Sequence, residues 1–289
     1  MAFDKQFPFK NLDTEVGLRK LISVINGLDD AGRRVLLNAL STQLSDAKKI
    51  QVLALLRSQV AQTDVAVRDW LVKGITASYV IGANYTVKAL KSIGFKVPAS
   101  LGGGLRTISA ELLASAPFMK PHLEAVNTLL SSAYLDFGNT MTGYMKGAEQ
   151  ILNDALKRQI RSSIAQGRLE GTAIADIKKV VKETIGDSGF TVLIDRGGRQ
   201  WQLGTYSEMV TRTHINKAAN EAAINRMGDF GVDIVQISEH GATDELCSSE
   251  EGNIYSISGD SPNYEPLDGH EPPYHPNCTH NIIPRPDLT

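Results

Sequence analysis

The spacing of apolar residues between Pro121 and Gln166 constrains the fold of this chain more than any other feature of its sequence. Successive members lie four or three residues apart, as in a coiled-coil seam; they are Leu130, Tyr134, Phe137, Met141, Tyr144, Ala148, Ile151 and Ala155. Pro121 suits the first helical turn, where its missing N–H group is not needed. Glycines at positions 138, 143 and 147 indicate a closely packed neighbour, a bend or a break. We expect the seam to pack against the N-terminal helices rather than against another subunit.

Helical spacing also dominates the chain before Ile93, where we expect four helices. The first two carry apolar stripes over residues 18–25 and 35–44. Ser45 or Asp46 caps the third helix, and Thr63-Asp64 opens the fourth, which runs toward Leu90. Residues 94–104 contain one proline and four glycines, which predicts a linker. A short helix at about residues 108–116 follows it.

The last hundred residues combine strand and helix patterns. Residues 190–203 predict a hairpin, with Gly197-Gly198 as its tight turn. An amphipathic helix follows from Gly204 to about Met227, and short strands are expected near residues 232–238, 254–257 and 280–283. The expected fold class is α+β: a mainly helical, elongated N-terminal body with a small α+β C-terminal module. The expected division is a helical region (1–93), a linker (94–104), a long-helix region (105–186) and the α+β module (187–289).

Charge is divided unevenly along a chain whose net charge is only −2. From Gly228 onward there are twelve acidic residues and a single basic one, Arg285, so the preceding body is basic. This split suggests different neighbours for the two ends, or acidic loops that merely keep a small module soluble. A basic patch along two expected helices suits either non-specific contact with DNA phosphates or a solvated helix face; its residues are Lys157, Arg158, Arg161, Arg168, Lys178, Lys179 and Lys182.

Several classes of protein are disfavoured by composition. The two cysteines cannot form a disulfide framework, so folding in a reducing cytosol is expected. No apolar run reaches the roughly 18–20 residues of a membrane span. The N-terminal residues lack the apolar core of a secretory signal.

The side chains best suited to metal binding lie between Ser238 and Pro286. Both cysteines and four of the six histidines are found there. Zinc prefers thiolate and imidazole ligands and needs four in a structural site; the candidates are Cys247, His275, Cys278 and His280, with His240 as a substitute. Two alternatives remain open: buried cysteines with histidines that hydrogen-bond the loops, and a Cys247–Cys278 disulfide in a mature extracellular particle.

Catalysis is not expected, and no catalytic residue is assigned. A thiol nucleophile needs a base within hydrogen-bond reach and an oxyanion donor, and sequence adjacency of Cys278 and His275 shows neither. An HNH-type nuclease would need a helix after the final Cys-x-His. Pro284 and Pro286 block such a helix.

Several short motifs in the last third of the chain occur in a distinctive order. They include Tyr206-Ser-Glu-Met209-Val-Thr-Arg212-Thr213, Ala219-Asn220-Glu221, the run from Gly231 to Gly241, Gly252-Asn-Ile-Tyr-Ser-Ile-Ser-Gly259, and His275-Pro276-Asn277-Cys278-Thr-His280. Over about Gly204–Pro284 the sequence resembles the phage minor capsid protein 2 family, which is similar to the wider phage head morphogenesis group that includes the Mu-like minor head proteins. We find no comparable resemblance over residues 1–190. Many relatives end in Cys-x-Cys, whereas this chain has Cys278-x-His280, which keeps a metal-competent atom.

The resemblance implies a structural protein of the virion without an established catalytic activity. It implies that a few copies form an oligomer in the virion, inside the capsid at the portal vertex. It also implies that the head assembles in the host cytoplasm. The implied partners are the portal protein or the major capsid protein, with packaged double-stranded DNA as a non-specific neighbour, and the implied roles are head assembly, DNA packaging or DNA ejection. The alternatives are a metal-dependent nucleic-acid enzyme or toxin-like effector, and a pure DNA-binding ejection protein.

Overall fold

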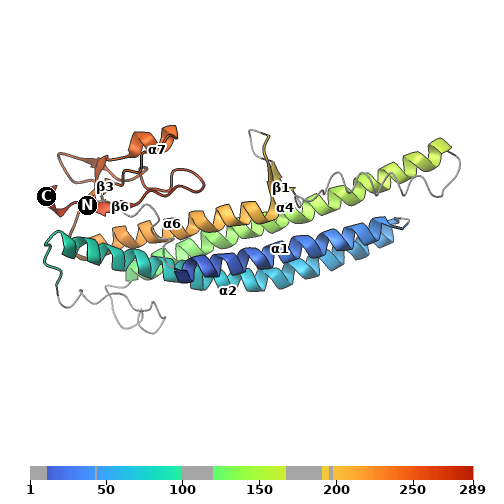
Figure 1. The fold of residues 1–289 in the computed structure, drawn as a ribbon, viewed down its shortest axis with the longest axis horizontal. Helices are drawn as coiled ribbons and strands as arrows, with labels where there is room; N and C mark the ends of the chain where they lie inside the picture. The colour runs from blue at the N-terminus through green and yellow to red at the C-terminus, as the bar shows by residue number, and fades with distance from the viewer. Residues whose placement is uncertain (1–11, 43, 99–119, 167–190, 195–197, 289) are drawn as a thin grey trace. The chain divides into compact units, whose positions relative to one another are not determined.

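The computed structural model describes residues 12–42, 44–98, 120–166, 191–194 and 198–288. Its long helices are α1 (Leu12–Leu40), α2 (Asp46–Ser92), α4 (Lys120–Gln166) and α6 (Leu203–Asp229), and a four-stranded sheet lies near the C-terminus (Figure 1). The expected α+β class is therefore confirmed. The chain forms two compact units: Met1–Leu18, Trp70–Ala133 and Met209–Thr289 make the first, and Arg19–Asp69 and Tyr134–Glu208 the second. The four-part division expected from the sequence stays a prediction.

The expectation of four helices before Ile93 is wrong, because the described residues there form only α1 and α2. Ser45 does cap α2, since its hydroxyl accepts the N–H of Lys48 at 3.2 Å. Thr63 and Asp64 do not start a new helix. Thr63 is buried within α2, and Asp64 forms an i, i+4 ion pair with Arg68 at 2.6 Å. Thr63 and Asp64, which could have capped a new helix, therefore lie inside the continuous helix α2.

The end of α2 coincides with the start of the expected linker. Gly94 has a φ of +82°, a conformation that glycine adopts without steric cost. The N–H of Phe95 reaches back to the carbonyl of Leu90 at 3.0 Å, which satisfies a carbonyl of the last helical turn. The linker beyond Pro98 and the short helix expected at residues 108–116 lie outside the described residues.

The long helix expected from Pro121 to Gln166 is confirmed as α4. Five of the expected seam positions are buried, namely Phe137, Met141, Tyr144, Ala148 and Ala155. At three others the buried residue is a neighbour: Leu129, Ala133 and Leu152 are buried where Leu130, Tyr134 and Ile151 were expected. The ideal 3.6-residue helical turn drifts relative to a 3.5-residue seam, which explains a change of buried position along a long helix. The helix continues through Gly138, where an added Cβ would meet nothing within 4 Å.

Within the second unit, α4 packs on the N-terminal helices, as expected for its seam. The hydroxyl of Tyr144 donates to the carbonyl of Leu28 in α1 at 3.4 Å. The ammonium of Lys49 in α2 donates to the side-chain oxygen of Asn153 at 2.6 Å. These contacts join α4 to both α1 and α2, so the seam has a partner within the same chain.

The expected hairpin is also confirmed, as a separate two-stranded sheet of the second unit. Its strands β1 (Thr191–Ile194) and β2 (Gln200–Gln202) pair antiparallel. Gly198 has a φ of +80°, which glycine adopts without steric cost. Residues 195–197 lie outside the described residues, so the expected Gly197-Gly198 turn stays a prediction. Trp201 packs its ring edge-on against Tyr206 at 5.9 Å between centroids, which ties the hairpin to the start of α6.

In the first unit, α6 makes two kinds of close contact with the other helices. A Cβ at Gly82 of α2 would lie 2.8 Å from the Cα of Ala219, so the backbones of α2 and α6 meet directly here. A polar network also joins three helices: His122 of α4 contacts the hydroxyl of Tyr79 in α2 at 2.9 Å and the carboxylate of Asp229 in α6 at 3.0 Å. Arg226 donates to the same carboxylate at 2.7 Å.

The small sheet of the first unit has the strand order β5-β4-β3-β6. Its strands are β3 (Ile234–Ile237), β4 (Ile254–Ser256), β5 (Glu265–Pro266) and β6 (Ile282–Pro284), and only the β4–β5 pair is parallel. The three expected strands are present, whereas the two-residue β5 has no alternating pattern to predict it. Leu90, Met227 and Val235 belong to the apolar cluster that packs the sheet on α2 and α6.

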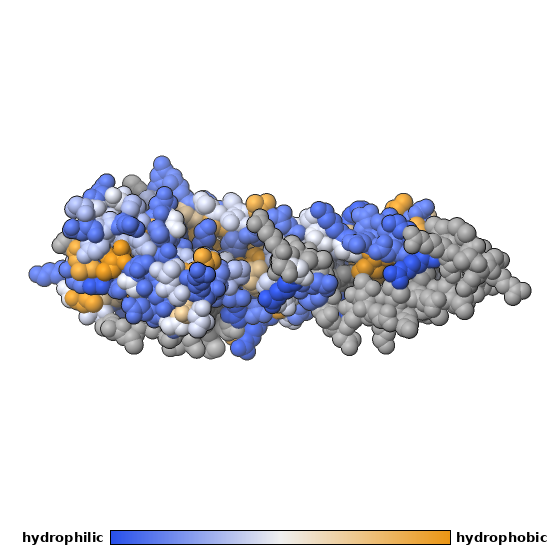
Figure 2. All heavy atoms as spheres, turned by 90° about the horizontal axis from the view of Figure 1, so that it is seen from above, coloured by the Kyte–Doolittle hydropathy of each residue, from blue (hydrophilic) through white to orange (hydrophobic). Residues whose placement is uncertain are grey.

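The surface seen in Figure 2 is mostly hydrophilic, with a few separate hydrophobic patches. The large apolar side chains that remain most exposed include Ile50 and Val65 of α2. None of the described helices contains a stretch that is apolar enough to cross a bilayer.

Candidate metal centre

Cys247 is positioned by the short helix α7 (Glu245–Glu250). Asp244 caps this helix: its carboxylate accepts the N–H groups of Leu246 at 3.0 Å and Cys247 at 3.3 Å. The thiol of Cys247 therefore lies in a fixed first turn, and the residue is only 1% exposed.

A tight turn brings His275 and Cys278 together. The N–H of Cys278 donates to the carbonyl of His275 at 3.0 Å, which closes a four-residue turn. Pro276 holds the second position, and Asn277 holds the third with a φ of +64°. Proline followed by a residue with positive φ is the arrangement of a type II turn, in which asparagine is tolerated at the third position.

Two asparagines of α6 hold the segment that follows this turn. The side-chain amide of Asn216 donates to the carbonyl of Cys278 at 2.7 Å. The amide of Asn220 donates to the carbonyl of His280 at 3.1 Å, and its oxygen accepts the N–H of Ile282 at 3.1 Å. These buried bonds fix residues 278–282 on the helix, because each broken bond would leave a buried backbone group unsatisfied.

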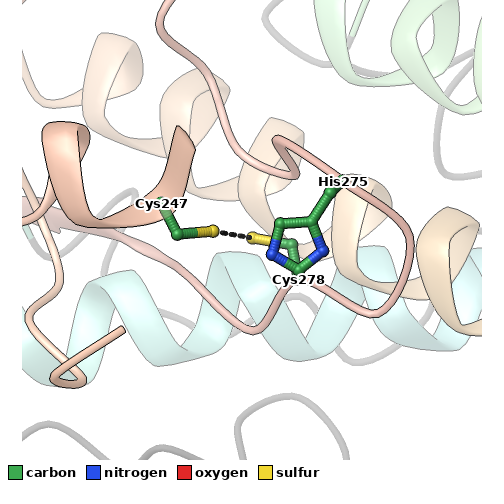
Figure 3. A group of neighbouring side chains, drawn as sticks. All are labelled: Cys247, His275 and Cys278. Atoms are coloured by element: carbon green, nitrogen blue, oxygen red, sulfur yellow. Dashed lines mark hydrogen bonds between the residues drawn. The ribbon is translucent and has the colours of Figure 1, made fainter. Parts of the chain in front are cut away.

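Three of the predicted ligands converge at this place, as Figure 3 shows: the thiols of Cys247 and Cys278 point toward one another beside the ring of His275. The two sulfur atoms are 3.8 Å apart, and one ligand atom from each of the three residues lies within 4.8 Å of the others. Both cysteines are free thiols in this structure. Two sulfurs and an imidazole are a donor set that suits zinc, so this cluster could hold a metal ion.

His280 lies beside the cluster and bridges it to a carboxylate. Its Nδ1 is 3.4 Å from the sulfur of Cys278, and its Nε2 is 2.8 Å from Oε1 of Glu251. The residue is 3% exposed, and its ring stacks on that of His240 with centroids 4.7 Å apart.

The carboxylate of Glu251 is held by backbone as well as by His280. It accepts the N–H groups of His240 at 2.7 Å, Gly241 at 3.1 Å and Ala242 at 3.0 Å. Burial would raise the pKa of Glu251, but these hydrogen bonds and His280 outweigh it and lower the pKa to about 2. Glu251 is therefore an ionised, oriented acceptor at neutral pH.

The two thiols have opposite acid–base properties. Burial and the neighbouring Cys278 raise the pKa of Cys247. Burial also opposes ionisation of Cys278, but its hydrogen bonds, above all with His280, outweigh burial and lower the pKa of this thiol. Burial lowers the pKa of His280 by a smaller amount than Cys278 and Glu251 raise it. Cys278 is thus the thiol that is closer to the thiolate form that binds metals.

The other predicted histidine has a different role. His240, the substitute ligand, is not part of the group of three; its Nδ1 contacts the hydroxyl of Thr279 at 3.1 Å. His270 also lies apart from the cluster, where its Nδ1 contacts Glu250 at 3.0 Å.

The family-motif positions are spread over both units, and those near the metal cluster are structural. Gly252 has a φ of +77°, and a Cβ there would meet the Glu239 carboxylate at 2.6 Å. Tyr206 packs on Trp201, and the hydroxyl of Thr213 donates to the carbonyl of Met209 at 2.9 Å. The remaining motif positions are Arg212 and Glu221 of α6, both partly buried, together with Asn220, Pro276 and Asn277 described above.

The predicted DNA-contact residues are only partly covered by the structure. Lys157 and Arg158 are exposed on α4, and Lys157 lies 4.0 Å from Asp154. Arg161 lies in α4, and its side chain is outside the described part of the chain. Arg168, Lys178, Lys179 and Lys182 also lie outside the described residues. DNA contact therefore stays a prediction.

Sequence reasoning did not identify Glu251, Asn216 or Asp244 as parts of this centre. Asp244 carried a usable signal, since an aspartate just before a short helical segment is a typical cap. Glu251 and Asn216 carried none, because they lie 29 and 62 residues from their partners His280 and Cys278.

No curated protein and no solved structure matches the chain significantly. A family profile described as phage minor capsid protein 2 matches residues 37–285. This range extends well into the helical body, where the sequence had shown no distinctive motif. Because the match covers most of the chain, the protein belongs to the phage minor capsid protein 2 family and is a structural protein of the phage head.

Proposed function

We propose that this protein is a minor head protein that acts inside the capsid at the portal vertex, in head assembly, DNA packaging or DNA ejection. The family match carries the proposal. Its partners are the portal protein, the major capsid protein or both, and several copies act together. The basic body tolerates packaged DNA, because lysines and arginines can replace the counterions of phosphates.

The charge of the C-terminal residues supports a docking role. Twelve acidic residues against one basic residue from Gly228 onward give this part of the chain a strongly negative charge. Complementary charge speeds encounter with a basic surface and rejects acidic ones. A basic patch on the portal or capsid protein is the surface that fits it.

The location is tested by an asymmetric reconstruction of the virion or procapsid. We expect density for the long helices next to the portal. Density confined to another site in the head, or a head that lacks the protein, would contradict the proposal. Binding of the purified chain to portal rings at increasing salt is a second test, because docking by charge weakens as salt screens it.

We further propose that the cluster of Cys247, His275 and Cys278 binds zinc as a structural ion. The observation that favours this is the convergence of two thiols and an imidazole within 4.8 Å. When bound, zinc would cross-link α7 to the loop before β6. Such a cross-link would stabilise a small sheet that has long polar loops. The residues themselves are already placed by the Asp244 cap, the type II turn and the asparagines of α6.

Metal analysis tests this part of the proposal. The full chain, purified without chelators, should contain one zinc per chain, and Cys247→Ser should lose it. Protein that contains no zinc and does not take up added zinc would refute metal binding. The proposed place in the head would be unaffected by that result.

A further inference from the structure

We propose that His280 completes a Cys2His2 zinc site and that Glu251 is the carboxylate that orients it. The inference rests on the proposed zinc function of the cluster and extends it to Glu251, a residue for which the sequence predicted no role. It is carried by three observations: the distances between ligand atoms, the hydrogen bonds of the two imidazoles, and the backbone groups that hold Glu251.

Two distances that involve the Cys278 sulfur match the edges of a zinc tetrahedron. With Zn–S bonds of about 2.3 Å, two sulfurs of a tetrahedral site lie about 3.8 Å apart. With Zn–N bonds of about 2.0–2.1 Å, a sulfur and a nitrogen lie about 3.5 Å apart. The structure has 3.8 Å between Cys247 and Cys278, and 3.4 Å between the Cys278 sulfur and Nδ1 of His280. His280 Nδ1 therefore lies at the distance from Cys278 that a fourth ligand needs.

The hydrogen bonds of both histidines leave one ring nitrogen available to a metal. Nδ1 of His275 contacts the carbonyl of Pro276 at 2.7 Å, so this nitrogen carries the proton and Nε2 keeps its lone pair. Nε2 of His280 contacts Glu251 at 2.8 Å, which leaves Nδ1 on the side of Cys278. A backbone carbonyl and a carboxylate are the usual outer partners of metal-bound histidines, since each fixes the ring nitrogen that binds.

Glu251 is itself fixed, which a positioning residue requires. Its carboxylate accepts three consecutive backbone N–H groups, those of residues 240–242. It follows α7, the helix that carries Cys247, so one short segment provides both a ligand and the carboxylate that orients another. Orientation by a held carboxylate raises the basicity of the histidine and its affinity for metal.

The neighbouring residue provides a matched control for the experiment. Glu250 also contacts an imidazole, that of His270, at 3.0 Å, and it accepts the hydroxyl of Tyr255 at 2.7 Å. Nδ1 of His270 contacts Glu250 and the hydroxyl of Tyr255, at 3.2 Å, rather than a proposed ligand. Glu250→Gln thus removes a carboxylate paired with histidine, one position away, without touching the proposed site.

The experiment measures zinc affinity of the full chain by competition with a chromophoric chelator, for the unmodified protein, Glu251→Gln and Glu250→Gln. We expect Glu251→Gln to weaken zinc binding by about 10- to 100-fold and Glu250→Gln to leave it unchanged. Glutamine keeps one oxygen, which can accept the N–H groups of His240 and Ala242 as Oε1 of Glu251 does, so circular dichroism should show a folded protein. Equal affinities for Glu251→Gln and the unmodified protein would show that Glu251 only holds the loop, and would overturn the proposal.

Cobalt substitution tests the fourth ligand separately. The visible spectrum of Co²⁺ depends on the number and type of its ligands, so His280→Ala should change the spectrum from that of a four-coordinate S2N2 site. Glu251→Gln should keep the spectrum at saturating metal, because it removes no ligand. An unchanged spectrum in His280→Ala would refute the fourth ligand while zinc binding by the other three residues stands. Failure of the unmodified protein to bind either metal would instead refute the zinc function itself.

Discussion

At the residue scale, a few buried polar side chains hold segments that have little regular structure of their own. Asn220 is such a residue: it is 2% exposed and pairs with backbone groups of both His280 and Ile282. The side chain of Asn220 makes three hydrogen bonds: with Asn216, with the carbonyl of His280 and with the N–H of Ile282. These bonds connect α6 to the segment that carries Cys278 and His280. These hydrogen bonds give Asn220, one of the family-motif positions, a structural role.

Replacing Asn220 by alanine should destabilise the first unit and weaken its metal binding. The change leaves the N–H of Ile282 without its partner and removes the shorter of the two hydrogen bonds to the carbonyl of His280, which keeps only Asn216 at 3.4 Å. A buried unsatisfied group costs about 1–3 kcal/mol. Chemical denaturation followed by circular dichroism measures the loss. Thr205→Ala, at an exposed position of the same helix, is the control; equal stability of both variants would contradict the role given to Asn220.

Asp229 should make the stability of the first unit depend on pH. Burial would raise its pKa, but His122 and Arg226 outweigh it and hold the pKa below the ordinary value of 3.8. A carboxylate with a lowered folded pKa stabilises the fold above its unfolded pKa, and this contribution is lost as the pH falls through the folded value. Asp229→Asn should therefore cost about 3 kcal/mol near neutral pH, since it removes the charge that pairs with the buried Arg226, and the difference should shrink below pH 3.8.

Urea unfolding at several pH values measures this difference. Asp154→Asn is the matched control, because Asp154 is 52% exposed and its 4.0 Å pair with Lys157 lies on the surface. Surface pairs contribute only about 0–1 kcal/mol. A constant difference between Asp229→Asn and the unmodified protein from neutral to acidic pH would refute the assigned role.

At the element scale, the helices meet through small residues in one place and through a polar network in another. Gly82 allows the backbone of α2 to contact Ala219 of α6, whereas Tyr79, His122 and Asp229 join α2, α4 and α6 by hydrogen bonds. The contact at Gly82 leaves no room for a Cβ atom, whereas a Cβ at Gly138 of α4 would meet nothing within 4 Å.

Alanine substitutions at these two glycines should have opposite effects. At Gly82 the new Cβ would overlap the backbone of Ala219, which forces α2 and α6 apart and should cost about 1–3 kcal/mol or more. At Gly138 alanine meets nothing and improves helix propensity, so stability should rise by about 1 kcal/mol. Thermal unfolding of both variants measures the effects, and destabilisation by Gly138→Ala would show that this glycine has a packing role.

At the scale of the whole molecule, the two units are stabilised differently. The described part of the second unit relies on helix seams and a hairpin, whereas the first combines helices with a four-stranded sheet and the cysteine–histidine cluster. A bound metal would therefore stabilise one unit only. This division predicts which part of the chain responds when metal is removed.

Chelation of zinc should loosen the C-terminal loops and leave the second unit intact. Because ligand binding stabilises only the structure that binds, amide hydrogen exchange should become faster around residues 240–282 and stay unchanged in α1 and α2 over Arg19–Asp69. Exchange measured by mass spectrometry before and after chelation tests this. Cys247→Ser is the control, since its exchange should not respond to chelator; faster exchange throughout the chain would contradict independent stabilisation.

The sequence by itself determined the helical body, the extent of α4, the cap of α2 and three strands of the small sheet. These features depend on local periodicity and on capping or turn residues, which act over a few positions. The sequence also supplied the ligand types, because thiols and imidazoles are concentrated after Ser238. It did not determine that Thr63-Asp64 lies inside a helix, since a capping residue and an i, i+4 ion pair look alike in sequence.

Only the tertiary structure decided which side chains meet. The contact between Glu251 and His280 joins residues 29 positions apart, and that between Asn216 and Cys278 spans 62. Such pairings depend on where whole elements pack, and no local pattern encodes that, because hydrogen bonds and burial act through space rather than along the chain.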